Sequence, residues 1–258
     1  MSIRPKKSLG QHFLTDENII GKIADAIPAK AGERVIEIGP GTGALTGALL
    51  KRFEDLIAVE LDQRAIEVLE QKFDGLQIHH ENVLDVDWEK LSIGKEQTHV
   101  VGNLPYYITS QILFALLENR HLIADALLMM QKEVAERLVA DIRTKDYGIL
   151  SVQTQLMCTP EILFPVSRHC FSPQPNVESA IVKLTFDKGE LNCSDKNLKT
   201  VVRTAFNQRR KKLSNALKPL VSKDKQPKGF DFDKRAEAWE PSEYEKLTAQ
   251  LVEDGILT

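Results

Sequence analysis

The stretch RVIEIGPGTGALTGALLKRF, which starts at Arg34, constrains the fold more than any other part of this chain. It predicts a buried strand, a glycine-rich loop and a helix in direct succession, which is typical of the first unit of an open α/β sheet. The loop carries Gly39, Gly41 and Gly43. Glycine lets the backbone turn sharply and approach a ligand closely, because it has no Cβ. The stretch therefore predicts both a fold class and a ligand site.

The rest of the first 190 residues repeats the alternation. The pattern predicts strands over 34–38, 56–60, 76–80, 99–102 and 124–131, with helices over 44–53, 63–73, 110–118 and 132–142. Such alternation predicts an open, mainly parallel sheet covered by helices on both faces. Two further segments, 151–157 and 179–186, follow without an obvious helix between them. We expect them to form an antiparallel pair at the sheet edge.

The C-terminal part of the chain is different in pattern and in charge. Helical periodicity covers 196–206, 209–217 and 243–253, with no strand signal. We therefore expect two domains, 1–189 and 190–258, the second small and all-α. Between Lys196 and Lys225 ten Lys or Arg residues face one acid, a net charge of +9 that leaves −12 on the remainder of a chain whose total is −3. A basic island on an acidic body predicts an anionic partner such as a phosphate backbone, and a solvated helix face is the alternative.

Two acidic residues indicate which cofactor the glycine loop serves. Glu60 ends the next predicted strand, where a carboxylate can accept hydrogen bonds from ribose hydroxyls. Glu37 stands just before the loop, where it would repel a pyrophosphate but balance a cation. S-adenosylmethionine carries a sulfonium, an ammonium and no phosphate, so the pattern favours it. A nicotinamide dinucleotide stays open because Ala44 is allowed at the third position of that fingerprint, and Glu37 could instead form a salt bridge with Arg34.

A second candidate site follows the strand over 99–102, in the sequence VVGNLPYYIT. Pro105 biases Leu104 to an extended conformation, so that the Leu104 carbonyl and the Asn103 side chain offer two neighbouring acceptors. Two acceptors suit an amine with two N–H donors, such as the N6 of adenine, and Tyr106 offers a flat face for stacking. Hydrogen bonds from N6 would localise its lone pair, so positioning and electrostatics could supply the catalysis. The alternative is an Asx-Pro turn that caps the helix from Thr109.

Composition excludes several classes of protein. Three cysteines without a CxxC pair argue against a disulfide framework or a zinc cluster, and we expect no metal site. No apolar run is long enough to span a bilayer, and the N-terminus lacks the apolar core of a signal peptide. We therefore expect a cytoplasmic protein without a membrane partner.

Seven ordered blocks resemble one family over nearly the whole chain. They are KKSLGQHFL (6–14), VIEIGPGTGALT (35–46), AVELD (58–62), VVGNLPYYIT (100–109), LMMQKEVAERL (128–138), FSPQPNVESAIVKL (171–184) and AFNQRRKKLSNAL (205–217). The chain resembles the small-subunit ribosomal RNA adenine dimethyltransferases of the KsgA/RsmA type, which are related to the Erm methylases of large-subunit RNA. The resemblance implies a Rossmann-like, class I S-adenosylmethionine-dependent methyltransferase fold with a C-terminal RNA-binding domain.

The residue patterns above and the resemblance together assign roles to individual residues. Cofactor binding falls to His12, Leu14, Glu37, Gly39, Gly41, Gly43, Glu60, Asn82 and Asn103. Catalysis falls to Asn103, Leu104 and Tyr106, and RNA contacts fall to Tyr106, Phe171, Arg209, Arg210 and Lys211. The implied reaction adds two methyl groups to each of two adjacent adenosines in the 3′-terminal hairpin loop of 16S rRNA. The implied partner is an immature small ribosomal subunit, bound by a monomer.

Two positions depart from the family pattern, and three alternatives stay open. Asn82 takes the place of an Asp that contacts the cofactor adenine, and Asp85 could substitute for it. Tyr107 stands where the family often has Asn, which predicts a packing difference. The alternatives are an Erm-like large-subunit target, a ribosome-assembly module whose methylation is incidental, and a nicotinamide oxidoreductase.

Overall fold

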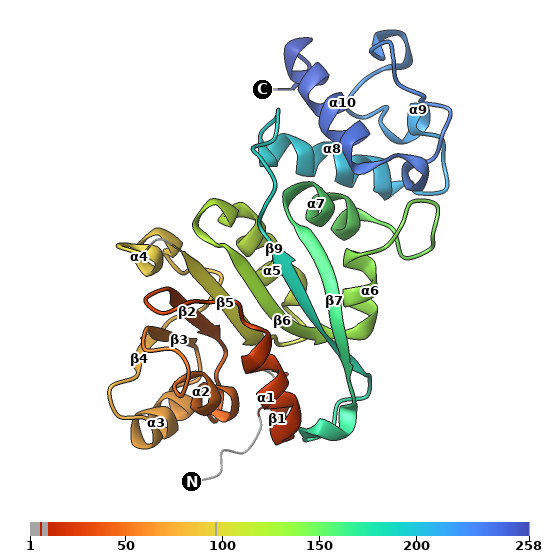
Figure 1. Cartoon of the computed structure of the whole chain (residues 1–258). Helices are drawn as coiled ribbons and strands as arrows, with labels where there is room; N and C mark the ends of the chain where they lie inside the picture. The colour runs from red at the N-terminus through yellow and green to blue at the C-terminus, as the bar shows by residue number, and fades with distance from the viewer. Residues whose placement is uncertain (1–5, 7–9, 96, 258) are drawn as a thin grey trace. The chain divides into compact units, whose positions relative to one another are not determined.

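The structure is a computed structural model that describes residue 6, residues 10–95 and residues 97–257. The chain divides into two compact units (Figure 1). The first unit comprises residues 1–135 and 161–186, and the second comprises residues 136–160 and 187–258. Within the described ranges, no helix is both long enough and apolar enough to cross a membrane.

The first unit is built on a seven-stranded sheet with the order β4-β3-β2-β5-β6-β9-β7 (Figure 1). The strands are β2 (Arg34–Ile38), β3 (Leu56–Glu60), β4 (Gln77–His80), β5 (Thr98–Asn103), β6 (Asp125–Gln131), β7 (Thr159–Val166) and β9 (Ser179–Thr185). The first five in this order are parallel, whereas β9 runs antiparallel to β6. The sequence order reverses at β2, which lies between β3 and β5. Ligands bind at such a reversal, beyond the carboxyl ends of the strands. The predicted α/β class is confirmed.

Helices and one small ribbon complete the first unit. The helices are α1 (Glu17–Ala26), α2 (Ala44–Leu49), α3 (Gln63–Lys72), α4 (Trp88–Ser92), α5 (Thr109–Glu118) and α6 (Lys132–Leu138). The ribbon pairs β1 (Phe13–Leu14) antiparallel with β8 (Phe171–Ser172). This pairing brings the N-terminal segment to a loop that lies more than 150 residues further along the chain. Residues 7–9 of the KKSLGQHFL block lie outside the described residues.

The second unit contains four α-helices among its described residues. They are α7 (Ile149–Met157), α8 (Asp195–Asn207), α9 (Leu213–Ala216) and α10 (Pro241–Glu253). Its core is aromatic: Trp239, Tyr147 and Tyr244 are fully buried. Both phenols are satisfied, because Tyr147 donates to the Trp239 carbonyl at 2.8 Å and Tyr244 donates to the Ala236 carbonyl at 2.6 Å. The helices predicted over 196–206 and 243–253 are confirmed.

The prediction of a strand over 151–157 is wrong, because this segment forms α7. Its apolar residues alternate over a few positions, which is ambiguous between a strand and a buried helix. The edge strand beside β9 is instead β7, which follows α7 directly. The sequence pattern does not predict this strand, because it contains Pro160 and Pro165 and proline argues against a strand except at a sheet edge. β7 occupies such an edge.

The prediction of a helix over 209–217 is also wrong for most of its length, since only Leu213–Ala216 is helical. The backbone bends before α9 because Lys212 forms an isolated antiparallel bridge with Arg235. The Leu213 amide donates to the Lys234 carbonyl at 2.8 Å. Hydrogen bonds to a distant segment here replace those of a continuous helix.

A buried ionic cluster ties three segments together at the amino ends of the strands. His99 of β5 is 2% exposed and lies between the carboxylates of Asp125 (Nδ1 to Oδ2, 2.8 Å) and Glu33 (Nε2 to Oε2, 3.0 Å). Burial by itself would lower the pKa of His99, but the two carboxylates outweigh burial and raise it. The cluster lies at the end of the sheet opposite to the carboxyl ends of the strands, and so has a structural role.

Candidate active site

A pocket opens at the carboxyl ends of β2, β3 and β5, where the topology predicts a ligand site. Its polar and glycine lining includes Gln11, His12, Glu37, Gly39, Gly41, Thr42, Glu60, Glu81, Asn82 and Asn103. Its apolar lining includes Leu14, Leu61, Val83, Leu104, Tyr106 and Tyr107. No lysine or arginine lines it among the described residues. Three carboxylates without a cation suit a positively charged ligand better than a pyrophosphate.

The glycine loop between β2 and α2 has two distinct constraints. Gly39 and Gly41 line the pocket and have positive φ values of 64° and 57°. Gly43 also has a positive φ, 79°, but it is not part of the lining. A Cβ on Gly43 would lie 2.4 Å from the ring of Phe73. Gly43 is therefore required for packing of α2 against the residues after α3, whereas Gly39 and Gly41 form the cradle.

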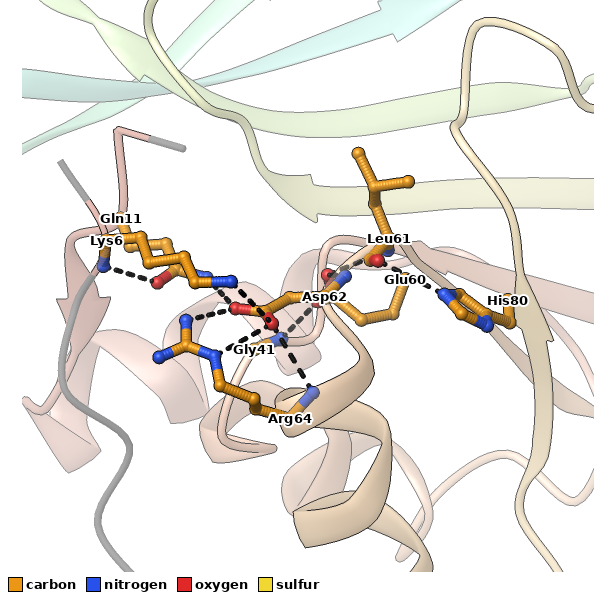
Figure 2. Close-up of polar contacts among 8 residues, drawn as sticks. All are labelled: Lys6, Gln11, Gly41, Glu60, Leu61, Asp62, Arg64 and His80. Atoms are coloured by element: carbon orange, nitrogen blue, oxygen red, sulfur yellow. Dashed lines mark hydrogen bonds and ion pairs between the residues drawn. The ribbon is translucent and has the colours of Figure 1, made fainter. Parts of the chain in front are cut away.

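Glu60 is held in place by the backbone around it (Figure 2). Its Oε1 accepts from the amides of Leu61 and Asp62, both at 2.8 Å, and its Oε2 accepts from the amide of Gly41 at 3.1 Å. Burial raises the pKa of Glu60, and these amides oppose that shift. A carboxylate has about four acceptor positions, so one remains for a ligand hydroxyl.

Glu37 is the less satisfied of the two buried carboxyls. It is 2% exposed, and the hydroxyl of Thr46 donates to its Oε2 at 2.6 Å. Burial raises the pKa of Glu37 to about 8, and the nearby charge of Glu60 adds to the shift. A cation bound in the pocket would favour the ionised form.

Asn82 lines the pocket, and Asp85 is not part of the lining. The Asn82 amide nitrogen donates to Asp85 Oδ2 at 3.0 Å, and its Oδ1 accepts from the Leu84 amide at 3.2 Å. The structure thus places Asn82 at the pocket and Asp85 behind it, where Asp85 orients the amide.

Asn103 ends β5 with its side-chain amide oriented by the N-terminal segment. Its Nδ2 donates to the backbone carbonyl of His12 at 2.9 Å. Asn103 Oδ1 and the Leu104 carbonyl accept no hydrogen bond from the part of the chain that the structure describes. The Asx-Pro alternative is not realised, because no side chain caps α5. Two neighbouring residues of the pocket therefore carry free acceptors.

The two tyrosines have different environments. Tyr106 is partly buried, and its hydroxyl shares a hydrogen bond of 2.7 Å with Ser179. One face of its ring stacks on His12, with centroids 5.7 Å apart and an interplanar angle of 25°. The His12 Nδ1 donates to the Pro173 carbonyl at 2.8 Å. Tyr107 is 56% exposed at the pocket.

Two of the predicted RNA contacts lie in unexpected settings. Phe171 is 3% exposed within the apolar core and does not line the pocket, so a stacking role would require it to move. The guanidinium of Arg209 is occupied by hydrogen bonds within the second unit. It donates to the Glu237 carboxylate at 2.6 Å and to the carbonyls of Lys145 and Thr144 at 2.7 and 2.8 Å.

The other two basic residues of this motif are on the surface, since Arg210 and Lys211 are exposed. They lie in a turn rather than on a helix. The two neighbouring side chains are accordingly available to an anionic partner, unlike that of Arg209.

Sequence reasoning missed two residues that follow Glu60. Leu61 lines the pocket although it is 50% exposed, and Asp62 is buried and contacts the N-terminal segment. Only the position of Leu61, directly after a predicted ribose ligand, could have indicated its place. Among the described residues no group of three or more His, Cys, Asp or Glu side chains could hold a metal ion.

Comparisons with known proteins agree on one family. The family model described as "Ribosomal RNA adenine dimethylase" matches residues 3–240. The chain is 46% identical over 250 residues to ribosomal RNA small subunit methyltransferase A of Parabacteroides distasonis, covering 95% of this chain and 93% of the relative. Its structure is similar to a dimethyladenosine transferase from Plasmodium falciparum, with a TM-score of 0.78, 26% identity and coverage of 95% and 98% of the two chains. It is also similar to the 23S rRNA methyltransferase ErmE, with a TM-score of 0.68, 26% identity and coverage of 93% and 99%.

Proposed function

This chain belongs to the ribosomal RNA adenine dimethylase family, and we propose that its targets are the N6 amines of two adjacent adenosines in the 3′-terminal hairpin loop of 16S rRNA. It is an S-adenosylmethionine-dependent enzyme that dimethylates adenine in 16S rRNA. The finer elements of the proposal are the hairpin loop, an immature small subunit as the partner, and a monomeric enzyme in the cytoplasm. The relative named for the small subunit supports this target over an Erm-like one, because it matches at 46% identity, against 26% for ErmE.

The pocket residues fit S-adenosylmethionine. The Gly39–Gly41 cradle and Leu14 would border the methionine part, Glu60 would accept from a ribose hydroxyl, and Asn82 would face the adenine edge. Glu37 would offset the positive charge. When bound, this cofactor supplies an electrophilic methyl group on a sulfonium.

The free acceptors at Asn103 and Leu104 carry the proposal for the target amine. The N6 lone pair of adenine is delocalised into the ring, which makes the amine a poor nucleophile. In the first transfer, Asn103 Oδ1 and the Leu104 carbonyl would each accept a hydrogen bond from one N6–H and so favour a geometry in which the lone pair is localised. Each methyl transfer would release one N6 proton to solvent, so the second would have one N–H left to hold. His12 contributes through its backbone, since its carbonyl fixes which end of the Asn103 amide accepts. Tyr106 would support the base by stacking.

The proposed 190–258 domain supplies RNA affinity. Arg210 and Lys211 would bind phosphates, while the hydrogen bonds of Arg209 stabilise the second unit. Charge–phosphate contacts make binding fall with salt. They also position the RNA without reading its sequence.

The test is methyl transfer by Asn103→Ala to small subunits that lack the modification. We expect transfer to fall by about two orders of magnitude or more, as when one preorganised polar contact is lost. The affinity for S-adenosylmethionine should change only severalfold. Asn119→Ala is the control, because the Asn119 amide donates to Ala115 at the end of α5. Normal turnover by Asn103→Ala would refute the acceptor role, and methylation of other adenosines by the wild-type enzyme would refute the target.

A further inference from the structure

Asp62 is a buried carboxylate beside the cofactor pocket with no role in the mechanism above. It follows β3 and caps the N-terminus of α3, accepting from the Arg64 amide at 3.3 Å. Its side chain is 2% exposed. A buried charge is retained only where neighbouring groups satisfy it. The partners of Asp62 therefore indicate what it holds in place.

One set of partners belongs to the N-terminal segment (Figure 2). Gln11 Nε2 donates to Asp62 Oδ2 at 3.1 Å. Gln11 Oε1 in turn accepts from the Lys6 amide at 2.9 Å, and the Lys6 ammonium lies 3.7 Å from Asp62 Oδ1. Gln11 also lines the pocket, directly before His12. The hydrogen bond between Gln11 and Asp62, which are 51 positions apart in sequence, thus joins the N-terminal segment to the residues that follow β3.

The backbone amide of Asp62 contacts a second residue that lines the pocket, Glu60. Its amide donates to Glu60 Oε1 at 2.8 Å. One residue therefore contacts both Glu60, the proposed ribose ligand, and Gln11 of the N-terminal segment. A change in the position of Asp62 would therefore displace both Gln11 and Glu60.

The charge of Asp62 is stable against pH. Arg64 donates to Asp62 Oδ1 at 3.0 Å and to Oδ2 at 2.5 Å. These hydrogen bonds lower the pKa of Asp62 to about 2, although burial opposes them. Gln11 therefore meets a permanent anion, and charge-assisted hydrogen bonds are stronger than neutral ones.

We infer that Asp62 is a positioning residue for the cofactor, which fixes Gln11 and its neighbours against the ribose-binding carboxylate. The inference rests on the proposed cofactor site. In Asp62→Asn, the new amide retains the size and the helix cap, since Asn is a good N-cap. With Oδ1 kept as the cap, however, its NH₂ group takes the place of Oδ2 and faces the donors of Gln11 and Arg64, so the Gln11 contact is lost.

The experiment measures S-adenosylmethionine affinity by calorimetry and steady-state kinetics on the full chain. We expect Asp62→Asn and Gln11→Leu each to raise Kd and KM on the order of tenfold, the loss of one hydrogen bond to a charged group. The value of kcat at saturating cofactor should stay within about twofold, because neither residue touches the reacting atoms. The double variant should be no worse than Asp62→Asn alone, since both changes remove the same contact.

Asp87→Asn is the matched control. Asp87 caps α4, accepts from the Lys90 amide at 3.1 Å and pairs with the Lys90 ammonium at 2.8 Å. This variant repeats the local change without a contact to the N-terminal segment, and its Kd should equal that of the wild type. If Asp62→Asn does not fold, Gln11→Leu carries the test alone.

An unchanged Kd in Gln11→Leu would overturn the inference. Fully additive losses in the double variant would also overturn it, because Asp62 would then act independently of Gln11. A wild-type chain that neither binds the cofactor nor transfers methyl groups would instead refute the proposed function.

Discussion

Replacing Glu37 by Gln tests whether the pocket recognises its cofactor through charge. Glu37 has a pKa of about 8 because it is buried, so at pH 7 only about one molecule in eleven carries the ionised form. A cationic ligand that requires this form binds with an affinity reduced by that fraction. Binding at pH 7 should therefore release close to one proton. Between pH 7 and pH 9, the contribution of Glu37 should raise the affinity about tenfold.

Calorimetry in buffers with different ionisation enthalpies counts the released protons. We expect nearly one proton for S-adenosylmethionine and fewer for S-adenosylhomocysteine, which lacks the sulfonium. The Glu37→Gln variant should release fewer protons with both ligands, and any contribution from the ligand amine cancels in the comparison with wild type. Equal proton counts for Glu37→Gln and wild type would refute the reasoning.

The same carboxyl predicts a stability difference without ligand. The folded protein retains a proton at Glu37 that the unfolded chain loses near its ordinary pKa of about 4.3. The group therefore costs stability increasingly as the pH rises from about 4.3 to about 8, by at most about 1.4 kcal/mol per pH unit. Glu37→Gln should melt higher than wild type at pH 8, and the difference between the two melting temperatures should shrink as the pH falls towards about 4.

Three further predictions concern stability and RNA binding. His99→Gln should lower the melting temperature more at pH 6 than at pH 9, because a raised histidine pKa stabilises the fold below about pH 6.5 and that contribution is lost as the pH rises through the folded value. Gly43→Ala should cost about 1–3 kcal/mol in urea unfolding, since its Cβ meets the Phe73 ring at 2.4 Å. Arg209→Ala should lower the unfolding free energy by about 1–3 kcal/mol, whereas Arg210→Ala should leave it unchanged and reduce the salt dependence of RNA binding by about one charge.

Local patterns were sufficient for the parallel half of the sheet and for one side of the pocket. Strands β2 and β3, the glycine loop and Glu60 lie within 27 residues, and each has a signal in its own neighbourhood. Fully buried parallel strands appear as continuous apolar runs, which are easy to locate. The edge strand β7 contains two prolines, which are disfavoured inside a sheet but tolerated at its edge. Its local pattern therefore does not predict a strand.

Residues whose roles depend on distant partners could not be placed from sequence. The Asn103 amide is oriented by His12, 91 residues away, and the requirement for glycine at 43 comes from Phe73. Arg209 belongs to a basic motif that resembles an RNA contact, yet its guanidinium binds within the second unit. Sequence identifies the residue type in each case, but the partner that decides its role is set by the tertiary fold.

The two buried carboxyl groups of the pocket, Glu60 and Glu37, differ in their hydrogen bonds and in how their charge responds to a ligand. Glu60 accepts hydrogen bonds from three backbone amides and is held in one orientation, which suits the ribose-binding role proposed for it. Glu37 has a single hydroxyl partner and a pKa of about 8, so its charge follows that of the ligand. Without the sulfonium charge, ionised Glu37 would lose its stabilisation and would take up a proton from solvent. Under the proposed role, Glu37 would therefore contribute to binding of the cationic cofactor but not to binding of the neutral thioether product. This role would let the pocket discriminate the cofactor from its product, although the two differ by one methyl group and one charge.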